Sequence, residues 1–284
     1  MKQGLTKDKY TIAEHQLKTN DGLHELYVQE WGSPKGAPVL FLHGGPGAGC
    51  NDRQKTIFDA KKHRVVFLDQ RGSGNSTPYG SLKDNTTQKL IEDIEQTRNR
   101  LSISSWVVVG TSWGSTLALC YAIKHPKRVN KIIIGGVFLG SKEEIDWLEK
   151  GHFRTFFPEV DAKVIRKKYT PYQYAKLAIP TIKLDDRYRL PDKLDFDEIP
   201  PKIELHFTKN NCFLPDNYIL KNAAKLTMPV TIVQGRYDMM TPPKTAYKLN
   251  SEFPNSTLIW TIAGHSSNDR ENYTAFKAIL SQTG

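Results

Sequence analysis

The sequence predicts an α/β protein built on a mainly parallel β-sheet with helices on both faces. Short apolar runs rich in β-branched residues, such as Val39–Leu42 and Val65–Leu68, recur along the chain. They are continuous rather than alternating, which is typical of strands that are buried on both faces. Segments with apolar residues at helical spacing lie between several of these runs, and strands that alternate with helices favour a parallel sheet.

The expected elements follow from these two patterns. Seven segments are predicted to be strands: Leu26–Trp31, Val39–Leu42, Val65–Leu68, Trp106–Val109, Ile132–Ile134, Val230–Val233 and Thr257–Trp260. Four segments are predicted to be helices: Thr87–Leu101, Ser115–His125, Pro243–Phe253 and Asn268–Ser281. The first helix carries Leu90, Ile91 and Ile94 on one face, and Asn85 or Thr86 can cap its start.

The alternation of strands and helices stops between about Gly140 and Asn222. This stretch is rich in lysine, aromatic residues and proline and has no clear buried strand. An irregular loop of this length is uncommon in a compact domain unless it is functional. The sequence therefore predicts a core domain formed by residues 1–139 and 223–284 and a helical cap domain formed by residues 140–222, with a long irregular loop as the alternative.

Composition excludes several classes of partner. The chain has 284 residues and a formal net charge of +10, but its lysines and arginines are spread along its length. No recognition motif accompanies this charge, so neither nucleic acid nor a membrane surface is expected as a partner. No apolar run reaches the ~18 residues of a membrane helix, and no apolar stretch of a secretory signal follows the basic N-terminus.

The three cysteines, Cys50, Cys120 and Cys212, are widely spaced and odd in number. This spacing fits neither a disulfide framework nor a zinc site, so we expect no metal and a reducing, cytoplasmic environment.

A Gly-x-Ser-x-Gly motif, Gly110–Gly114, connects the apolar run Trp106–Val109 to a segment with helical character. In this context the motif predicts a nucleophile elbow, a sharp turn that exposes the hydroxyl of Ser112 at the edge of the sheet. Glycines are needed where the backbone turns sharply or approaches another segment closely. The alternative is a glycine-rich turn with a bystander serine.

A serine nucleophile needs a histidine base, which in turn is oriented by a carboxylate. Asp238 follows the predicted strand Val230–Val233, and His265 follows the predicted strand Thr257–Trp260. Both therefore lie at the carboxyl edge of the sheet, and their order after Ser112 is that of α/β-hydrolases. A turn aspartate and a loop histidine are the structural alternatives.

The developing oxyanion of an acyl-transfer reaction needs hydrogen-bond donors. The loop His43-Gly44-Gly45-Pro46-Gly47 follows the strand Val39–Leu42, where such hydrolases commonly supply one backbone N–H. The residue after the nucleophile supplies the other, so Gly45 and Trp113 are the predicted donors. We interpret His43 as structural because it precedes Ser112, contrary to the order expected of a base.

Together these motifs resemble one family. The runs HGGPG at His43–Gly47, DQRGSGNS at Asp69–Ser76, GTSWGSTLAL at Gly110–Leu119, GRYD at Gly235–Asp238 and GHS at Gly264–Ser266 are similar to those of the proline iminopeptidases. These are α/β-hydrolase serine peptidases that release an N-terminal proline. The similarity continues into Gly136–Phe138, Trp147 and the Phe-Phe-Pro-Glu run that ends at Glu159.

The resemblance also implies how a substrate is held. Family members bind the free α-amino group of the substrate with acidic residues of the cap, and the matching positions here are Glu204 and Asp216. A solvated helix carboxylate is the alternative for Glu204, and a turn or helix N-cap for Asp216. Phe138 resembles a proline-pocket aromatic but could equally be a core residue, and Gly44 is expected beside the substrate.

One departure from the family pattern concerns the cap. The family usually has a Trp-rich helix between these elements, whereas Val160–Lys202 is shorter and contains tyrosines but no tryptophan. Despite this departure, the resemblance implies an exopeptidase that acts on short peptides or amino-acid amides without a cofactor. A small-molecule esterase or amidase is the alternative, and a non-catalytic binding protein of the same fold is a third possibility.

Overall fold

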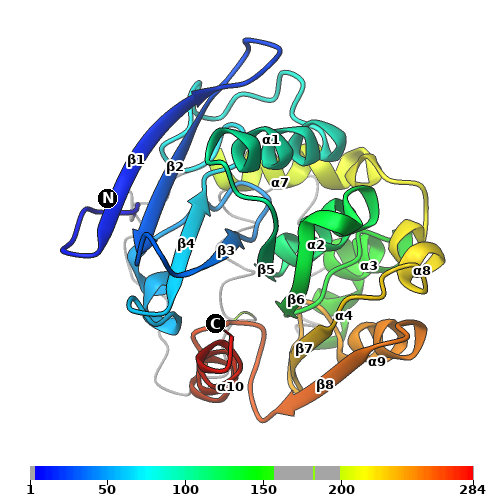
Figure 1. The fold of residues 1–284 in the computed structure, drawn as a ribbon. Helices are drawn as coiled ribbons and strands as arrows, with labels where there is room; N and C mark the ends of the chain where they lie inside the picture. Colours follow the sequence, from blue (N-terminus) through cyan, green and yellow to red (C-terminus); the bar gives the residue numbers. More distant parts are fainter. Residues whose placement is uncertain (1–3, 157–181, 183–198, 284) are drawn as a thin grey trace, which may run out of the picture.

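The structure, a computed structural model, describes residues 4–156, 182 and 199–283. Within these residues one sheet has eight strands in the order β1-β2-β4-β3-β5-β6-β7-β8 (Figure 1). The strands are β1 (Thr11–Lys18), β2 (Glu25–Gly32), β3 (Ala37–Leu42), β4 (His63–Leu68), β5 (Trp106–Thr111), β6 (Val129–Gly135), β7 (Val230–Gly235) and β8 (Ser256–Thr261). Strand β2 is antiparallel to β1 and β4, and the pairs from β4 to β8 are parallel. The predicted fold class is confirmed.

Each of the seven predicted strands lies inside an observed strand, but β1 was not predicted. It forms one edge of the sheet and pairs only with β2. Its residues are partly exposed or exposed along the whole strand, and Glu14 and Lys18 carry charge. A strand at a sheet edge does not need an apolar run, so β1 lacks the signal that revealed the buried strands.

Helices occupy the connections between strands. The α-helices are α1 (Thr87–Arg100), α2 (Trp113–Lys124), α3 (Lys142–Asp146), α4 (His152–Phe156), α7 (Ile199–Lys209), α8 (Tyr218–Ala223), α9 (Pro243–Glu252) and α10 (Arg270–Ser281). The 3₁₀-helices are η1 (Asp52–Ile57), η2 (Pro126–Arg128) and η4 (Asn211–Phe213), and η3 (Trp147–Gly151) is a π-helix. Helix α1 is capped by the Thr86 side chain, as the sequence allowed. None of the described helices is long and apolar enough to cross a membrane.

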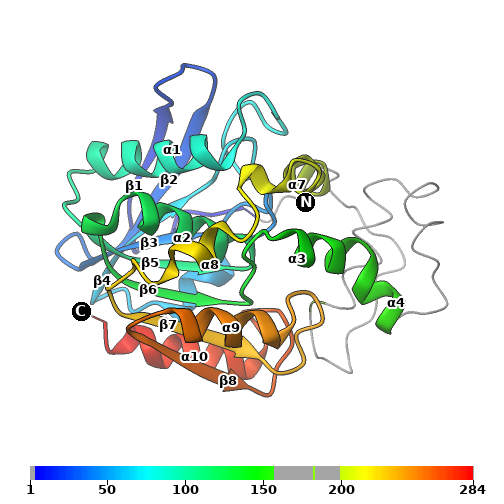
Figure 2. The ribbon, with the colours of Figure 1, turned by 90° about the vertical axis from the view of Figure 1, so that its right-hand side faces the viewer.

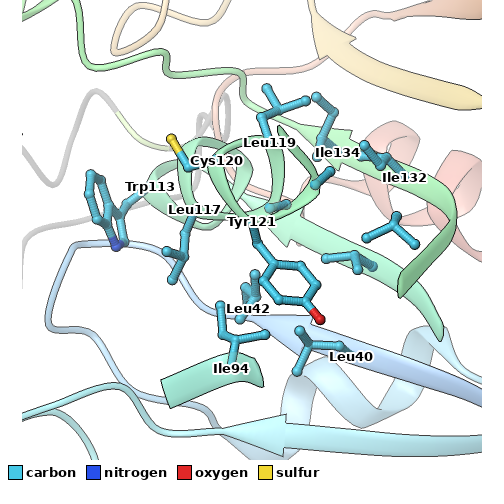
Figure 3. Packing of buried hydrophobic residues seen from close by; sticks show 14 of the residues in the cluster. Leu40, Leu42, Ile94, Trp113, Leu117, Leu119, Cys120, Tyr121, Ile132 and Ile134 are labelled. Carbon is cyan, nitrogen blue, oxygen red and sulfur yellow. The ribbon is translucent and has the colours of Figure 1, made fainter. Parts of the chain in front are cut away.

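Two apolar clusters pack the sheet from its two faces. Helices α1, α2, α8 and α9 contribute to one cluster, and η1 and α10 contribute to the other. Helix α2 is buried along Trp113–Ala122, and Figure 3 shows its side chains packed against Leu40 and Leu42 of β3 and Ile132 and Ile134 of β6. This packing fixes the first residues of α2 at the carboxyl end of the sheet.

Helices α3, α4 and α7 lie at the end of the molecule where β6 leads into α3 (Figure 2). Contacts attach this region to the loops at the strand ends. The indole of Trp147 in η3 donates a hydrogen bond to the Met239 carbonyl at 2.9 Å, and the ring of Phe207 in α7 lies 4.8 Å from the Trp113 ring. The core cluster also includes Ile145 of α3, Ile203 and Phe207 of α7, and Ile219 and Ala223 of α8. The division of the chain into a core and a cap domain stays a prediction.

Candidate active site

Ser112 stands between β5 and α2 with a positive φ of 56°, an unusual conformation for a residue with a side chain. The two glycines of the motif allow this turn. A Cβ on Gly110 would lie 2.2 Å from the Gly114 carbonyl oxygen, and one on Gly114 would lie 2.1 Å from the Leu42 carbonyl oxygen. The strand–turn–helix setting predicted from the motif is present, and strained backbone of this kind is common at functional sites.

The structure brings Ser112, His265 and Asp238 together. The Ser112 Oγ lies 3.0 Å from His265 Nε2, and His265 Nδ1 lies 2.9 Å from Asp238 Oδ2. The three residues follow β5, β8 and β7, and the carboxyl ends of these parallel strands share one edge of the sheet. The Ser112 hydroxyl and the Asp238 carboxylate are therefore each within hydrogen-bond distance of the His265 ring, the arrangement that a nucleophile, a base and an orienting carboxylate require.

Both oxygens of the Asp238 carboxylate accept hydrogen bonds. Its Oδ1 accepts from the backbone N–H groups of Met240 and Thr241 at 3.0 and 2.8 Å. Its Oδ2 accepts from Gln234 Nε2 at 2.9 Å and from the Thr241 hydroxyl at 2.8 Å, as well as from His265. Donors on both oxygens hold the carboxylate in one orientation.

Gln234 and Thr241 were not identified from the sequence. Gln234 follows the apolar residues Ile232 and Val233 in strand β7 and is fully buried. A buried amide must find partners, so its position in that strand was a usable signal. It also accepts a hydrogen bond from the Val137 N–H at 3.0 Å, which connects the end of β6 to the Asp238 loop.

The environment of His265 shifts its pKa upward. Burial of the ring alone would lower the pKa, but the charge of Asp238 and its hydrogen bond to Nδ1 outweigh burial, and the charges of Asp269 and Glu204 add to them. Gly136 lies against the same ring, because a Cβ there would be 3.0 Å from Cε1 and 3.1 Å from Nδ1. The histidine can therefore accept a proton at Nε2 while Asp238 stabilises the resulting charge.

The two predicted oxyanion donors are the backbone N–H groups of Trp113 and Gly45. Trp113 is the first residue of α2, so its N–H has no acceptor within the helix. Gly45 has a φ of 109°, and among the described residues its N–H has no hydrogen-bond acceptor. Gly44 lies directly beside Ser112, since a Cβ on it would be 3.2 Å from the Ser112 Cβ.

His43 is buried away from the nucleophile and supports the loop that carries Gly44 and Gly45. Its Nε2 accepts the Gln70 N–H at 3.1 Å, and its Nδ1 lies 2.9 Å from the Gly44 carbonyl oxygen. Burial lowers the pKa of His43 to about 4, which keeps the ring neutral. These contacts agree with a structural role.

Glu204 is the predicted substrate-binding residue that lies near the triad. It belongs to α7, whose Ile203 packs against Gly47 and whose Phe207 packs against Trp113. Burial raises the pKa of Glu204 to about 7, and the charge of His265 opposes this rise in part. Among the described residues the Glu204 carboxylate has no hydrogen-bond or ion-pair partner. An ammonium group bound beside the triad would supply one.

The structure does not bring Asp216 to this group. Its side chain lies in an exposed turn before α8 and accepts a hydrogen bond from the Lys142 N–H at the start of α3. This is the turn that its Pro-Asp-Asn sequence allowed. Phe138 is buried in the core cluster beside α2, where its carbonyl accepts the Thr116 hydroxyl at 2.6 Å. The tyrosines of residues 160–202 and Glu159 lie outside the described residues.

Comparisons with known proteins agree with this geometry. A family model described as the alpha/beta hydrolase fold matches residues 37–269. A proline iminopeptidase of Arabidopsis thaliana is 39% identical, and the alignment covers 89% of this chain and 75% of the plant protein. A proline iminopeptidase of Xylella fastidiosa is 34% identical over 93% of this chain and 95% of its own length. This chain belongs to the proline iminopeptidase family.

Solved structures of hydrolases share the fold of this chain. A hydrolase of Bacillus anthracis superimposes with a TM-score of 0.72 at 19% identity, covering 96% of this chain and all of the other. An esterase of Exiguobacterium antarcticum superimposes with a TM-score of 0.69 at 21% identity, covering 93% and 97% of the two chains. At these identities the likeness shows the shared fold. Among the described residues, no group of His, Cys, Asp or Glu side chains could hold a metal ion.

Proposed function

We propose that this protein is a serine exopeptidase that releases an N-terminal residue, preferably proline, from short peptides or amino-acid amides. The hydrogen-bonded series Ser112–His265–Asp238 beside the unpaired Glu204 carboxylate carries this proposal. The names of the curated relatives support the substrate class. We also propose a cytoplasmic location, as its cysteine usage suggests.

In the proposed reaction, Ser112 Oγ attacks the scissile carbonyl while His265 Nε2 takes its proton. The oxyanion accepts hydrogen bonds from the N–H groups of Gly45 and Trp113. The tetrahedral intermediate collapses to an acyl-enzyme, and His265 returns the proton to the leaving amine. Water then attacks the acyl-enzyme by the same route and releases the free residue.

Glu204 supplies the selectivity in this proposal. A buried ammonium needs a negative partner, so a free N-terminus is held by the Glu204 carboxylate within one residue of Ser112. The test compares proline-naphthylamide with its N-acylated form and with a short-chain p-nitrophenyl ester. Equal hydrolysis of the blocked and free naphthylamides would contradict the aminopeptidase proposal and favour a general amidase or esterase.

Replacing Glu204 with glutamine should lower kcat/KM for proline-naphthylamide by about 100-fold, because removal of one partner of a buried charge pair costs ~2–5 kcal/mol. Hydrolysis of the p-nitrophenyl ester should change less than about threefold, since an ester lacks the ammonium group. Glu252→Gln, an exposed change at the end of α9, is the matched control. Equal losses on both substrates would show that Glu204 does not bind the amine.

The pH dependence should also differ between the two substrates. The Glu204 pKa is raised to about 7, so its charged form is lost as the pH falls through 7. The His265 pKa is raised as well, so the neutral base is lost on the same side. Between pH 8 and 5, kcat/KM for proline-naphthylamide should fall more steeply than for the ester, which depends on His265 alone. In Glu204→Gln the two slopes should become equal, and unequal slopes there would refute this assignment.

A further inference from the structure

Gln70 follows β4 and is 3% exposed, and both polar atoms of its side chain have partners near the nucleophile. Its Oε1 accepts a hydrogen bond from the Trp113 indole N–H at 2.9 Å. Its Nε2 donates to the His43 carbonyl at 3.0 Å, and its backbone N–H donates to His43 Nε2 at 3.1 Å. One residue therefore bonds to both the start of α2 and the loop after β3.

These two segments carry the proposed oxyanion donors. They are far apart in the sequence, so the covalent chain does not fix their positions relative to each other. Trp113 belongs to the elbow after β5, and Gly45 lies two residues beyond His43 in the loop after β3. They meet at a close backbone approach, where a Cβ on Gly114 would lie 3.0 Å from the His43 carbonyl oxygen. The side-chain amide of Gln70 bridges this junction from a third element.

We infer that Gln70 is a positioning residue that sets the spacing of the two oxyanion donors, an inference that rests on the proposed function. Oxyanion stabilisation depends on donors held in place before the reaction, at 2.7–3.1 Å from the developing charge. Gln70 holds the Trp113 indole on one side and the His43 peptide on the other. Loss of the amide leaves each segment free to shift relative to the other.

An amide is required at this position because its partners are of opposite kinds. The indole N–H needs an acceptor and the His43 carbonyl needs a donor, and the side chain of glutamine offers both. Methionine has a similar length but can replace neither hydrogen bond with comparable strength. Gln70→Met therefore removes the bridge while largely filling the same space.

In Gln70→Met, kcat should fall about 10- to 100-fold on proline-naphthylamide and on a p-nitrophenyl ester, with KM changed less than about threefold. Removal of a whole oxyanion donor costs about 10²–10³ in kcat, and a displaced donor should cost less. Affinity for a proline boronic acid, which forms a tetrahedral adduct with serine, should fall in proportion to kcat/KM. Affinity for free proline should not change.

Two further variants separate positioning from stability. Trp113→Phe keeps a ring against Phe207 but removes the indole N–H, so it should lower kcat in the same way. The kcat of the double variant should fall by less than the product of the two single losses, because both changes break the same hydrogen bond, the one between Gln70 and Trp113. Gln96→Met is the matched control: the Gln96 amide also accepts one hydrogen bond and donates another, here with the Asn20 N–H and the Lys18 carbonyl, but it lies in α1 and, among the described residues, has no hydrogen bond to the triad. It should lower the melting temperature without changing kcat.

A folded Gln70→Met protein with kcat within twofold of the wild type would overturn the inference. So would boronic acid and proline affinities that fall together, which is the result expected of a general distortion. The ester distinguishes the two proposals, since it reports the oxyanion hole without an α-amino contact. A wild-type protein that cleaves the ester but not proline-naphthylamide would refute the aminopeptidase proposal. The inference about Gln70 would then be tested by the effect of Gln70→Met on ester hydrolysis.

Discussion

Ser112→Ala should lower kcat for proline-naphthylamide by about 10⁵- to 10⁶-fold, because among the described residues no other hydroxyl lies within hydrogen-bond distance of His265 Nε2. The Ser112 Oγ lies 3.0 Å from His265 Nε2, and alanine keeps the Cβ that the strained turn already accommodates. The free energy of unfolding should therefore change by less than about 1 kcal/mol. Rate measurements, labelling with a fluorophosphonate and a thermal melt together check the prediction.

Ser251→Ala is the matched control for this change, because Ser251 is exposed in α9 and, among the described residues, its hydroxyl donates only to the Lys248 carbonyl. It should keep full activity and fluorophosphonate labelling. If Ser112→Ala retained more than about 1% of the wild-type rate, another nucleophile would have to carry the reaction. If it lost activity together with its thermal transition, the loss would reflect unfolding rather than chemistry.

Asp238→Asn should lower kcat by about 10⁴-fold, the loss seen when an orienting aspartate of a serine triad becomes an amide. Both oxygens of Asp238 face donors: the N–H groups of Met240 and Thr241 on one side, and Gln234 and His265 on the other. The NH₂ group of asparagine would face a donor in either orientation. If it faced His265, it would also favour the tautomer with a proton on Nε2, which cannot act as a base toward Ser112.

The same mismatch should destabilise the fold by about 1–3 kcal/mol, since one buried donor loses its acceptor. Activity and chemical denaturation of Asp238→Asn, measured beside Asp59→Asn in an exposed turn, check both effects. The activity loss should persist at pH values above the pKa of His265, because the defect is the position of a proton rather than its presence. Recovery of the wild-type rate at high pH would contradict this account.

The fold could be predicted because the sheet is buried. Parallel strands that are covered on both faces must be apolar along their length, so β3, β4 and β5 stand out as continuous runs. Strand β1 could not be predicted, because it is only partly buried and has no continuous apolar run. Helix α2 begins at Trp113, two residues before the predicted start, because the turn at Ser112 leads directly into the helix.

Parts of the candidate site were visible for a similar reason. Ser112, Asp238 and His265 each follow an apolar strand, and the shared edge of a parallel sheet requires that such residues meet. The supporting residues Gln70, Gln234 and Gly136 carried weaker signals. Glutamine and glycine are common residue types, and the role of each of these three residues depends on the side chain that it contacts at the edge of the sheet.

Two acidic residues of the predicted cap show which features follow from local sequence and which depend on tertiary packing. Local sequence determined the strands, the elbow and the order of the triad, because backbone sterics and burial act on neighbouring residues. The family resemblance implied that Glu204 and Asp216 both bind the amine. The packing of α7 on Gly47 and Trp113 holds Glu204 close enough for its charge to act on His265, while the turn before α8 directs Asp216 to the start of α3. These contacts join elements that are far apart in the chain, so no local sequence pattern could predict them.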